Sequence, residues 1–203
     1  MKKKIICFAG LDGSGKTTQA RMTNEWLNAN GFPSEFVRFH TELTKAEKPE
    51  VVKRSTKYLI ENKLMLSLSA IELLKEAFQI QMKIQKNIAP LIMIGKNIVF
   101  DRYIETYDAY TALTDKKENW VRTINQPLAQ PDYYFFIDVL PEVSYGRILK
   151  TGRRISDHET VEQLEKARNY YLENKEKYSF IIIDGNQSVE DVHEEIKRHI
   201  INT

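Results

Sequence analysis

A glycine-rich loop near the start of the chain constrains the fold more than any other segment. Residues 10–17 follow the pattern G-x-x-x-x-G-K-T, and they come directly after an apolar run at residues 5–9. The run predicts a buried strand, and the residues after Lys16 are able to open a helix. At such a helix N-terminus, free backbone N–H groups and the positive end of the helix dipole bind phosphate oxygens. The loop therefore predicts an α/β fold and a site for a nucleoside triphosphate.

Individual residues of this loop have distinct expected roles. Lys16 is expected to reach the β- and γ-phosphates of ATP, and the Thr17 hydroxyl is expected to bind Mg²⁺. A chance glycine-rich turn is the alternative, but it would not require the strand before the loop or the helix after it. The predicted ATP site in this segment comprises Gly10, Asp12, Gly13, Ser14, Gly15, Lys16, Thr17 and Thr18.

Composition limits the class of protein. The 203 residues, 10% aromatic and 29% charged, predict one folded domain, spanning 1–203, with a sizeable core. A formal net charge of +2 gives no argument for a nucleic-acid or membrane partner, and no run approaches the ~20 apolar residues that span a bilayer. The single cysteine, Cys7, excludes an internal disulfide and suits a cytoplasmic protein.

Apolar runs and helical patterns alternate along the chain, which predicts a doubly wound sheet. The expected strands lie at 5–9, 35–39, 97–100, 133–139 and 180–183, and the expected helices at 16–30, 49–61, 64–94, 104–113, 141–150, 157–175 and 188–199. Pro90 should end or kink the long helix. The fold expected is a three-layer sandwich, in which a five-stranded parallel sheet is flanked by helices and ligands bind beyond the carboxyl ends of the strands.

A second group of polar residues follows the third predicted strand. Asp101 ends an apolar strand, which is where a phosphate-loop protein places the acid that holds Mg²⁺; the alternative is a strand-ending turn residue. Arg102 comes next, and a guanidinium there is able to grip a second phosphate in a bidentate fork. The pair therefore predicts a donor phosphate on the loop and an acceptor phosphate on Arg102. No Asn-Lys-x-Asp segment, which GTPases use to read guanine, occurs in the chain.

A polar segment at 147–159 carries Arg147, Arg153 and Arg154. Such a segment is able to close over a nucleotide, where its arginines would neutralise the transferring phosphoryl group and help to exclude water. The alternative is an exposed basic helix end.

These motifs together resemble the thymidylate kinase family, whose members make dTDP from dTMP and ATP. The resemblance is carried by residues 12–19 (Asp-Gly-Ser-Gly-Lys-Thr-Thr-Gln), by Asp101-Arg102-Tyr103 with Ala109-Tyr110, by 130–142 with Arg147, and by 183–192. Thr106 stands where the family usually has Ser. The match covers most of the chain except about 40–95, and it implies a homodimer.

The resemblance also implies roles for residues. Asp12 would contact the 3′-hydroxyl of the acceptor sugar, and Tyr110 would pack beside the deoxyribose. Arg147, with Arg153 or Arg154, would serve the donor and the transition state, while the Asp184–Gln187 loop, with Asn186, would lie near adenine. The implied acceptor site comprises Asp12, Arg38, Phe39, Phe78, Gln79, Gln81, Arg102, Tyr103, Thr106 and Tyr110.

The chain departs from the family's pattern where the acceptor base is recognised. His40 replaces the proline of the Arg-Phe-Pro segment that some members of the family carry, and no arginine occurs between Arg54 and Arg102, although the family places one on the long helix. Phe78 is therefore either a base-stacking ring or a core aromatic. Two alternatives stay open: a kinase for another nucleotide or for a deoxynucleoside, with Glu105 as its base, and a nucleotide-binding regulatory protein with little turnover.

Overall fold

The computed structural model describes residues 4–39, 48–63, 68–112, 124, 130–156 and 159–201. Its centre is a five-stranded parallel sheet in the order β2-β3-β1-β4-β5. The strands are β1 (Ile5–Gly10), β2 (Ser34–Arg38), β3 (Asn97–Asp101), β4 (Tyr133–Asp138) and β5 (Ile181–Asp184). The predicted α/β fold is therefore confirmed. At most of the strand ends, the observed bound differs from the predicted one by a single residue.

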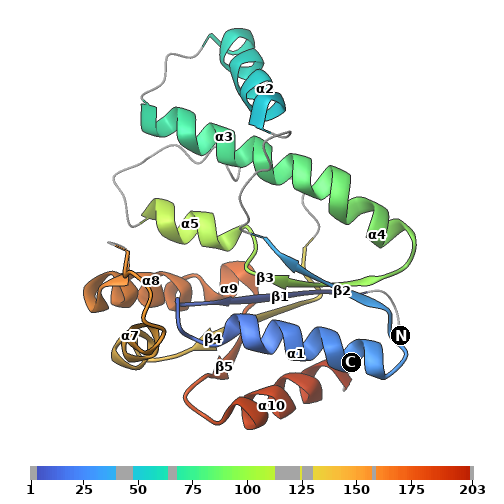
Figure 1. Cartoon of the computed structure of the whole chain (residues 1–203), viewed down its shortest axis with the longest axis vertical. Helices are drawn as coiled ribbons and strands as arrows, with labels where there is room; N and C mark the ends of the chain where they lie inside the picture. Colours follow the sequence, from blue (N-terminus) through green and yellow to red (C-terminus); the bar gives the residue numbers. More distant parts are fainter. Residues whose placement is uncertain are drawn as a thin grey trace.

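Helices cover both faces of the sheet (Figure 1). One face packs against α1 (Lys16–Ala29) and α10 (Val189–Ile201), whose apolar residues meet alternate strand residues such as Ile6 and Phe8. The other face, which includes Cys7 and Phe100, packs against a different set of helices. These are α3 (Leu68–Lys83), α5 (Glu105–Ala112), α8 (Val161–Glu173) and α9 (Lys175–Tyr178). This division follows from the period of two along each strand, which sends successive side chains to opposite faces.

The long helix predicted at 64–94 is interrupted in the structure. After α3 comes a π-helical turn, η1 (Ile84–Ile88), and then α4 (Ala89–Met93), with Pro90 in its first turn. The Ala89 N–H donates to the carbonyl of Ile84, five residues back. Proline has no N–H and its ring crowds the carbonyl four residues earlier, so the distortion falls in the turn before Pro90. Residues 64–67 lie outside the described residues.

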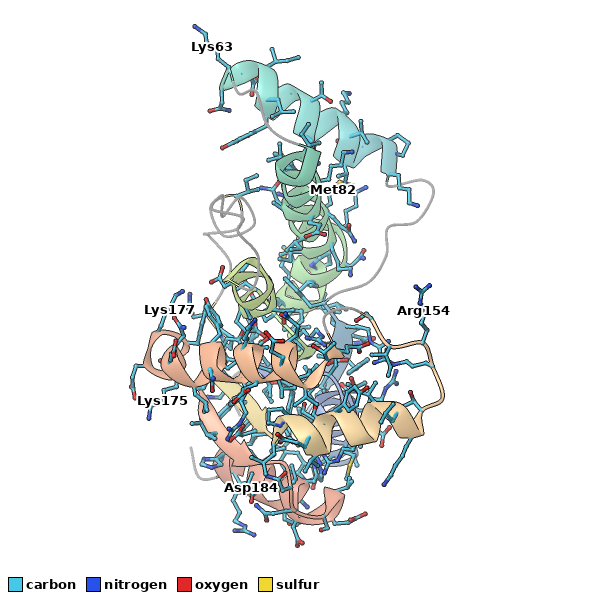
Figure 2. All side chains as sticks on the ribbon, turned by 90° about the vertical axis from the view of Figure 1, so that its left-hand side faces the viewer. Lys63, Met82, Arg154, Lys175, Lys177 and Asp184 are labelled. Atoms are coloured by element: carbon cyan, nitrogen blue, oxygen red, sulfur yellow. The ribbon has the colours of Figure 1, made fainter. Side chains whose placement is uncertain are left out.

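Two further helices complete the described structure. Helix α2 (Lys48–Glu61) lies against α3, at the end of the molecule farthest from the sheet (Figures 1 and 2). Helix α7 (Pro141–Lys150) follows β4 and packs on α8.

The helix expected at 157–175 begins later, at Val161, because the Thr160 hydroxyl caps it by accepting from the Gln163 N–H at 3.3 Å. Within the described ranges, no helix is both long enough and apolar enough to cross a membrane.

Candidate active site

The phosphate loop lies at the carboxyl end of β1, as its sequence predicted. Gly10, Gly13 and Gly15 all have positive φ, and a Cβ on Gly13 would come within 2.6 Å of the Ser144 carbonyl of α7. The Ser144 hydroxyl also donates to the carbonyl of Asp12. Helix α7 therefore packs directly against the phosphate loop. No sequence pattern indicates this contact, because Ser144 lies 131 residues from Gly13.

Lys16 is the first residue of α1 and is almost fully buried, with 5% of its surface exposed. Its ammonium donates to the Leu11 carbonyl at 2.8 Å and lies 3.5 Å from Oδ1 of Asp12. Burial, with a smaller contribution from the Arg102 guanidinium, lowers the pKa of Lys16 to about 8. A buried cation at the N-terminus of a helix is suited to receiving an anionic ligand.

Asp101, the last residue of β3, joins the loop to β2. Thr17 Oγ1 donates to Oδ2 of Asp101 at 2.7 Å, and Arg38 Nε lies 3.4 Å from the same oxygen. The other oxygen, Oδ1, is buried and has no hydrogen-bond partner among the residues that the structure describes. The structure thus brings together the two predicted metal-binding residues and the arginine on the neighbouring strand.

Arg102 turns back toward the phosphate loop. Its backbone has a φ of +69°, a left-handed conformation that non-glycine residues rarely adopt. Its guanidinium donates to Oδ1 of Asp12, the oxygen that also faces the Lys16 ammonium. Asp12 therefore lies between the residue expected to hold the donor phosphate and the residue expected to hold the acceptor phosphate.

A hollow of about 220 Å³ extends from the phosphate loop toward β5. It is lined by loop residues (Gly13, Ser14, Gly15, Thr18), by Arg147 and by the segment after β5 (Gly185, Gln187, Val189). Arg147 donates to the Gly185 carbonyl at 3.1 Å and thereby ties α7 to that segment. Asp184 and Asn186 lie outside this lining: the Asn186 N–H and amide donate to Oδ1 of Asp184 at 2.9 and 2.7 Å, which forms a turn.

The two other lid arginines lie in different surroundings. Both ends of the Arg153 guanidinium donate to the Glu159 carboxylate, which also accepts from the Ser156 N–H at 2.8 Å. The hydrogen bond from Arg153 lowers the pKa of Glu159. Arg154 is exposed and points away from the body of the protein (Figure 2). Glu159 was not among the predicted site residues, and only its spacing of six from Arg153 could have signalled it.

Several residues of the implied acceptor site are buried. Phe39 is 2% exposed and packs against Phe100 and Tyr103, with ring centroids 5.8 and 4.9 Å apart. Tyr103 is 4% exposed, and burial raises its pKa. The Thr106 hydroxyl donates to Oε1 of Glu105 at 3.2 Å. The structure thus buries the side chains of Phe39, Tyr103 and Thr106 in the protein interior, where they pack next to the site.

The long helix presents its predicted residues differently. Phe78 is half-buried, and its ring lies 5.8 Å from that of Tyr58 on α2. Gln79 and Gln81 are also half-buried on α3. Lys83, which no sequence motif marks as a site residue, donates to the Phe39 carbonyl at 2.9 Å. The side chain of Tyr110 and the whole of His40 lie outside the described residues.

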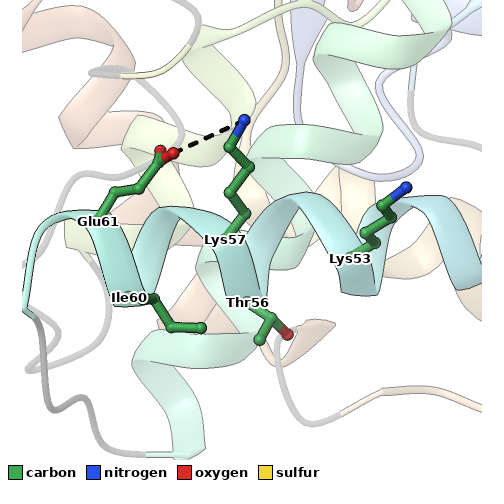
Figure 3. Close-up of a pocket in the computed structure, with 5 residues that line it drawn as sticks. All are labelled: Lys53, Thr56, Lys57, Ile60 and Glu61. Carbon is green, nitrogen blue, oxygen red and sulfur yellow. Dashed lines mark ion pairs between the residues drawn. The ribbon is translucent and has the colours of Figure 1, made fainter.

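A larger hollow, of about 480 Å³, lies along α2 (Figure 3). All the residues that line it come from one helix, and the ion pair between Lys57 and Glu61 spans 3.6 Å. Figure 3 shows Ile60 and Thr56 pointing away from Lys53, Lys57 and Glu61, so the lining side chains lie on two sides of one helix and do not surround a common space as in a small-molecule site.

The parallel sheet, the phosphate loop and the paired Asp12–Arg102 and Thr17–Asp101 contacts define a P-loop phosphotransferase. The thymidylate kinase family model matches residues 8–196. The chain belongs to the thymidylate kinase family, and by homology it phosphorylates dTMP to dTDP with ATP.

Curated archaeal proteins resemble the chain along nearly its whole length. A probable thymidylate kinase of Archaeoglobus fulgidus is 29% identical over 198 residues, which are 97% of this chain and 94% of that protein. A probable thymidylate kinase of Methanocaldococcus jannaschii is 29% identical over 206 residues, covering 98% and 96%. A third, from Pyrococcus horikoshii, is 29% identical over 201 residues, covering 97% and 95%.

Proposed function

We propose that Lys16 and Arg102 of this chain hold the ATP γ-phosphoryl group and the dTMP phosphate on either side of Asp12. The observation that carries the proposal is the pair of contacts to Oδ1 of Asp12, from the Arg102 guanidinium and, at 3.5 Å, from the Lys16 ammonium. Two cations held at one carboxylate are suited to two phosphate groups that must approach each other for in-line transfer.

The chemistry needs positioning and charge neutralisation more than a base. The phosphate of a nucleoside monophosphate is already ionised at neutral pH, so its oxygen attacks without prior proton removal. Glu105, the base considered for a deoxynucleoside acceptor, is 0% exposed and accepts hydrogen bonds from Tyr134 and Thr106. Its burial disfavours that alternative and supports a monophosphate acceptor.

We also propose Mg²⁺ as the cofactor, with Thr17 and Asp101 as its protein ligands. The unpartnered Oδ1 of Asp101 and the neighbouring Thr17 hydroxyl offer the oxygen donors that Mg²⁺ prefers. Few protein ligands are needed, because Mg²⁺ keeps several waters and binds substrate phosphates; accordingly, the described residues contain no larger cluster of metal-ligating side chains. Bound Mg²⁺ would neutralise charge on the β- and γ-phosphates.

The segment 147–159 is proposed as a lid on a single kinase domain spanning 1–203. Arg147 reaches the hollow beside the loop, and Glu159 holds Arg153 in a defined orientation. Closing the segment would bring Arg153 toward the transferring phosphoryl group and exclude water. Asp184, Asn186 and Gln187 are proposed to border adenine. A homodimer is proposed on the family resemblance alone.

An acceptor panel tests the proposal. The protein is incubated with ATP and Mg²⁺, and ADP release is measured with dTMP, dUMP, UMP, CMP or thymidine in turn. We expect dTMP to give the highest kcat/KM and thymidine to give none. Turnover of thymidine above that of dTMP would favour a deoxynucleoside kinase, while ATP binding without ADP release on any acceptor would favour a regulatory protein.

A further inference from the structure

Glu105 is a buried carboxyl beside the proposed acceptor site, and the phosphoryl transfer itself does not use it. It is the first residue of α5, directly after the turn that carries Arg102, and none of its surface is exposed. A buried carboxylate is costly unless several donors reach it. The identity of those donors indicates what Glu105 does.

The two oxygens of Glu105 have different partners. Oε1 accepts from the Tyr103 backbone N–H at 3.3 Å and from the Thr106 hydroxyl at 3.2 Å. Oε2 accepts from the Tyr134 hydroxyl of β4. One oxygen thus binds the turn after Arg102, and the other anchors the carboxylate to the sheet.

Arg102 needs such support because its backbone is strained. Its φ of +69° costs a non-glycine residue of the order of 1–2 kcal/mol, and a strained conformation persists only where neighbouring contacts over-determine it. The Arg102 N–H donates to the Phe8 carbonyl of β1 at 2.9 Å, which fixes the peptide before it. Glu105 binds the next N–H along the chain, that of Tyr103, and so fixes the peptide after it.

We propose that Glu105 is the positioning residue that holds the Arg102 turn in its left-handed conformation and thereby aims the Arg102 guanidinium at the acceptor phosphate. The inference rests on the proposed role of Arg102 in acceptor binding. Glu105 itself touches no substrate; it acts through Arg102.

The surroundings of Glu105 make its effect depend on pH. Burial raises the pKa of Glu105 to about 7, against the opposing effects of its hydrogen bonds and of the Arg102 charge. Facing it are Cys7 from β1, Tyr134 from β4 and Tyr103 from the turn. Burial raises the pKa of the Cys7 thiol and of Tyr103, so both stay neutral at pH 6–8.5. Ionised Glu105 accepts from the Tyr103 N–H in a charge-assisted bond, which is stronger than the bond to the protonated form.

The test compares two variants of Glu105 with a matched control on the same helix. Glu105→Leu removes the acceptor of the Tyr103 N–H, and Glu105→Gln keeps an acceptor oxygen but cannot ionise. Asp108→Asn is the control: Asp108 is another buried carboxyl of α5, but its Oδ2 accepts from the Tyr178 hydroxyl and lies 3.6 Å from the Lys177 ammonium. We expect kcat/KM for dTMP to fall about tenfold or more in Glu105→Leu, mainly through KM, with the KM for ATP within about threefold.

For Asp108→Asn, we expect the dTMP constants to stay within about twofold of the parent's. Equal dTMP constants in Glu105→Leu and Asp108→Asn would overturn the proposal. If Glu105→Leu does not fold, Glu105→Gln decides: the ratio of parent to variant kcat/KM for dTMP should rise between pH 6 and 8.5. A constant ratio would overturn the inference. The ionisation of dTMP affects both proteins equally and cancels in this ratio.

A readout without substrate separates this inference from the proposed function. In ¹⁵N–¹H NMR spectra, the Tyr103 amide of the parent should titrate with a midpoint near pH 7, and this titration should vanish in Glu105→Gln. A Tyr103 amide that is insensitive to Glu105 would contradict the positioning role of Glu105 even in an active kinase. A Glu105-dependent titration in a protein that does not phosphorylate dTMP would instead show that only the proposed function fails.

Discussion

The buried ammonium of Lys16 predicts that the protein takes up a proton when it binds a nucleoside triphosphate. Burial lowers the pKa of Lys16 to about 8 in the free protein. A phosphate charge at about 4 Å, at an effective dielectric constant of about 20, favours the ammonium by about 4 kcal/mol, or about three pKa units. Binding should therefore return Lys16 to its fully protonated state.

The size of the uptake follows from the pKa. With a pKa of about 8, about a tenth of Lys16 is neutral at pH 7, about half at pH 8 and about nine-tenths at pH 9. These fractions are the protons expected per bound nucleotide. The phosphate groups of the nucleotide are already ionised at pH 8 and above, so they contribute little to the exchange.

Isothermal titration calorimetry measures this number directly. A non-hydrolysable ATP analogue, together with Mg²⁺, is titrated into the protein in several buffers that differ in ionisation enthalpy. The slope of the observed binding enthalpy against the buffer's ionisation enthalpy gives the number of protons exchanged. Lys16→Arg is the control, because arginine stays protonated at every pH used. Uptake that is absent at pH 8–9 in the parent, or equal in Lys16→Arg, would refute the assignment of Lys16 as a desolvated phosphate ligand.

Four further perturbations test other parts of the site. Asp101→Asn should raise the half-saturating Mg²⁺ concentration about tenfold or more, and an unchanged value in a Mg²⁺ titration of activity would remove Asp101 from the metal site. Arg102→Ala should raise the KM for dTMP by about 30–150-fold and leave the KM for ATP within threefold; steady-state kinetics showing the reverse would exchange the two sites. Glu105→Gln should gain stability relative to the parent by about 3 kcal/mol between pH 4.5 and 8. The raised pKa means that the folded parent loses stability as pH rises through this window, and parallel urea-unfolding profiles would contradict it. Gly13→Ala should cost about 2–4 kcal/mol in urea unfolding, because its φ is +81° and its Cβ would meet a carbonyl of α7 at 2.6 Å, whereas Gly31→Ala, with φ +79° and open space, should cost only about 1–2 kcal/mol.

The sheet and the phosphate loop were predictable from sequence because they depend on local patterns. Buried parallel strands read as short apolar runs, and the residues that follow each strand necessarily meet at one edge of the sheet. The sequence therefore predicts that Lys16, Thr17, Asp101 and Arg102 lie close together. In the structure Thr17 donates to Asp101, while Lys16 and Arg102 both contact Oδ1 of Asp12.

The remaining features depend on packing between distant segments. Pro90 signalled a break, but the sequence does not show whether the helix ends there or absorbs the break in a π-helical turn. Phe39 has the chemistry of either a ligand-stacking ring or a core aromatic, and only its contacts with Phe100 and Tyr103 reveal that it lies in the core. The left-handed φ of Arg102 has no sequence signature, since no glycine marks it.

The central claim is that the chain transfers the γ-phosphoryl group of ATP to the phosphate of dTMP. The most direct test uses ATP labelled with ¹⁸O in its γ-phosphoryl group, incubated with dTMP, Mg²⁺ and the protein, and analysed by mass spectrometry. We predict that dTDP forms with the labelled oxygens in its β-phosphoryl group, in amounts equal to the ADP released. Labelled inorganic phosphate together with unchanged dTMP would contradict the claim, because it would show that water and not dTMP accepts the phosphoryl group.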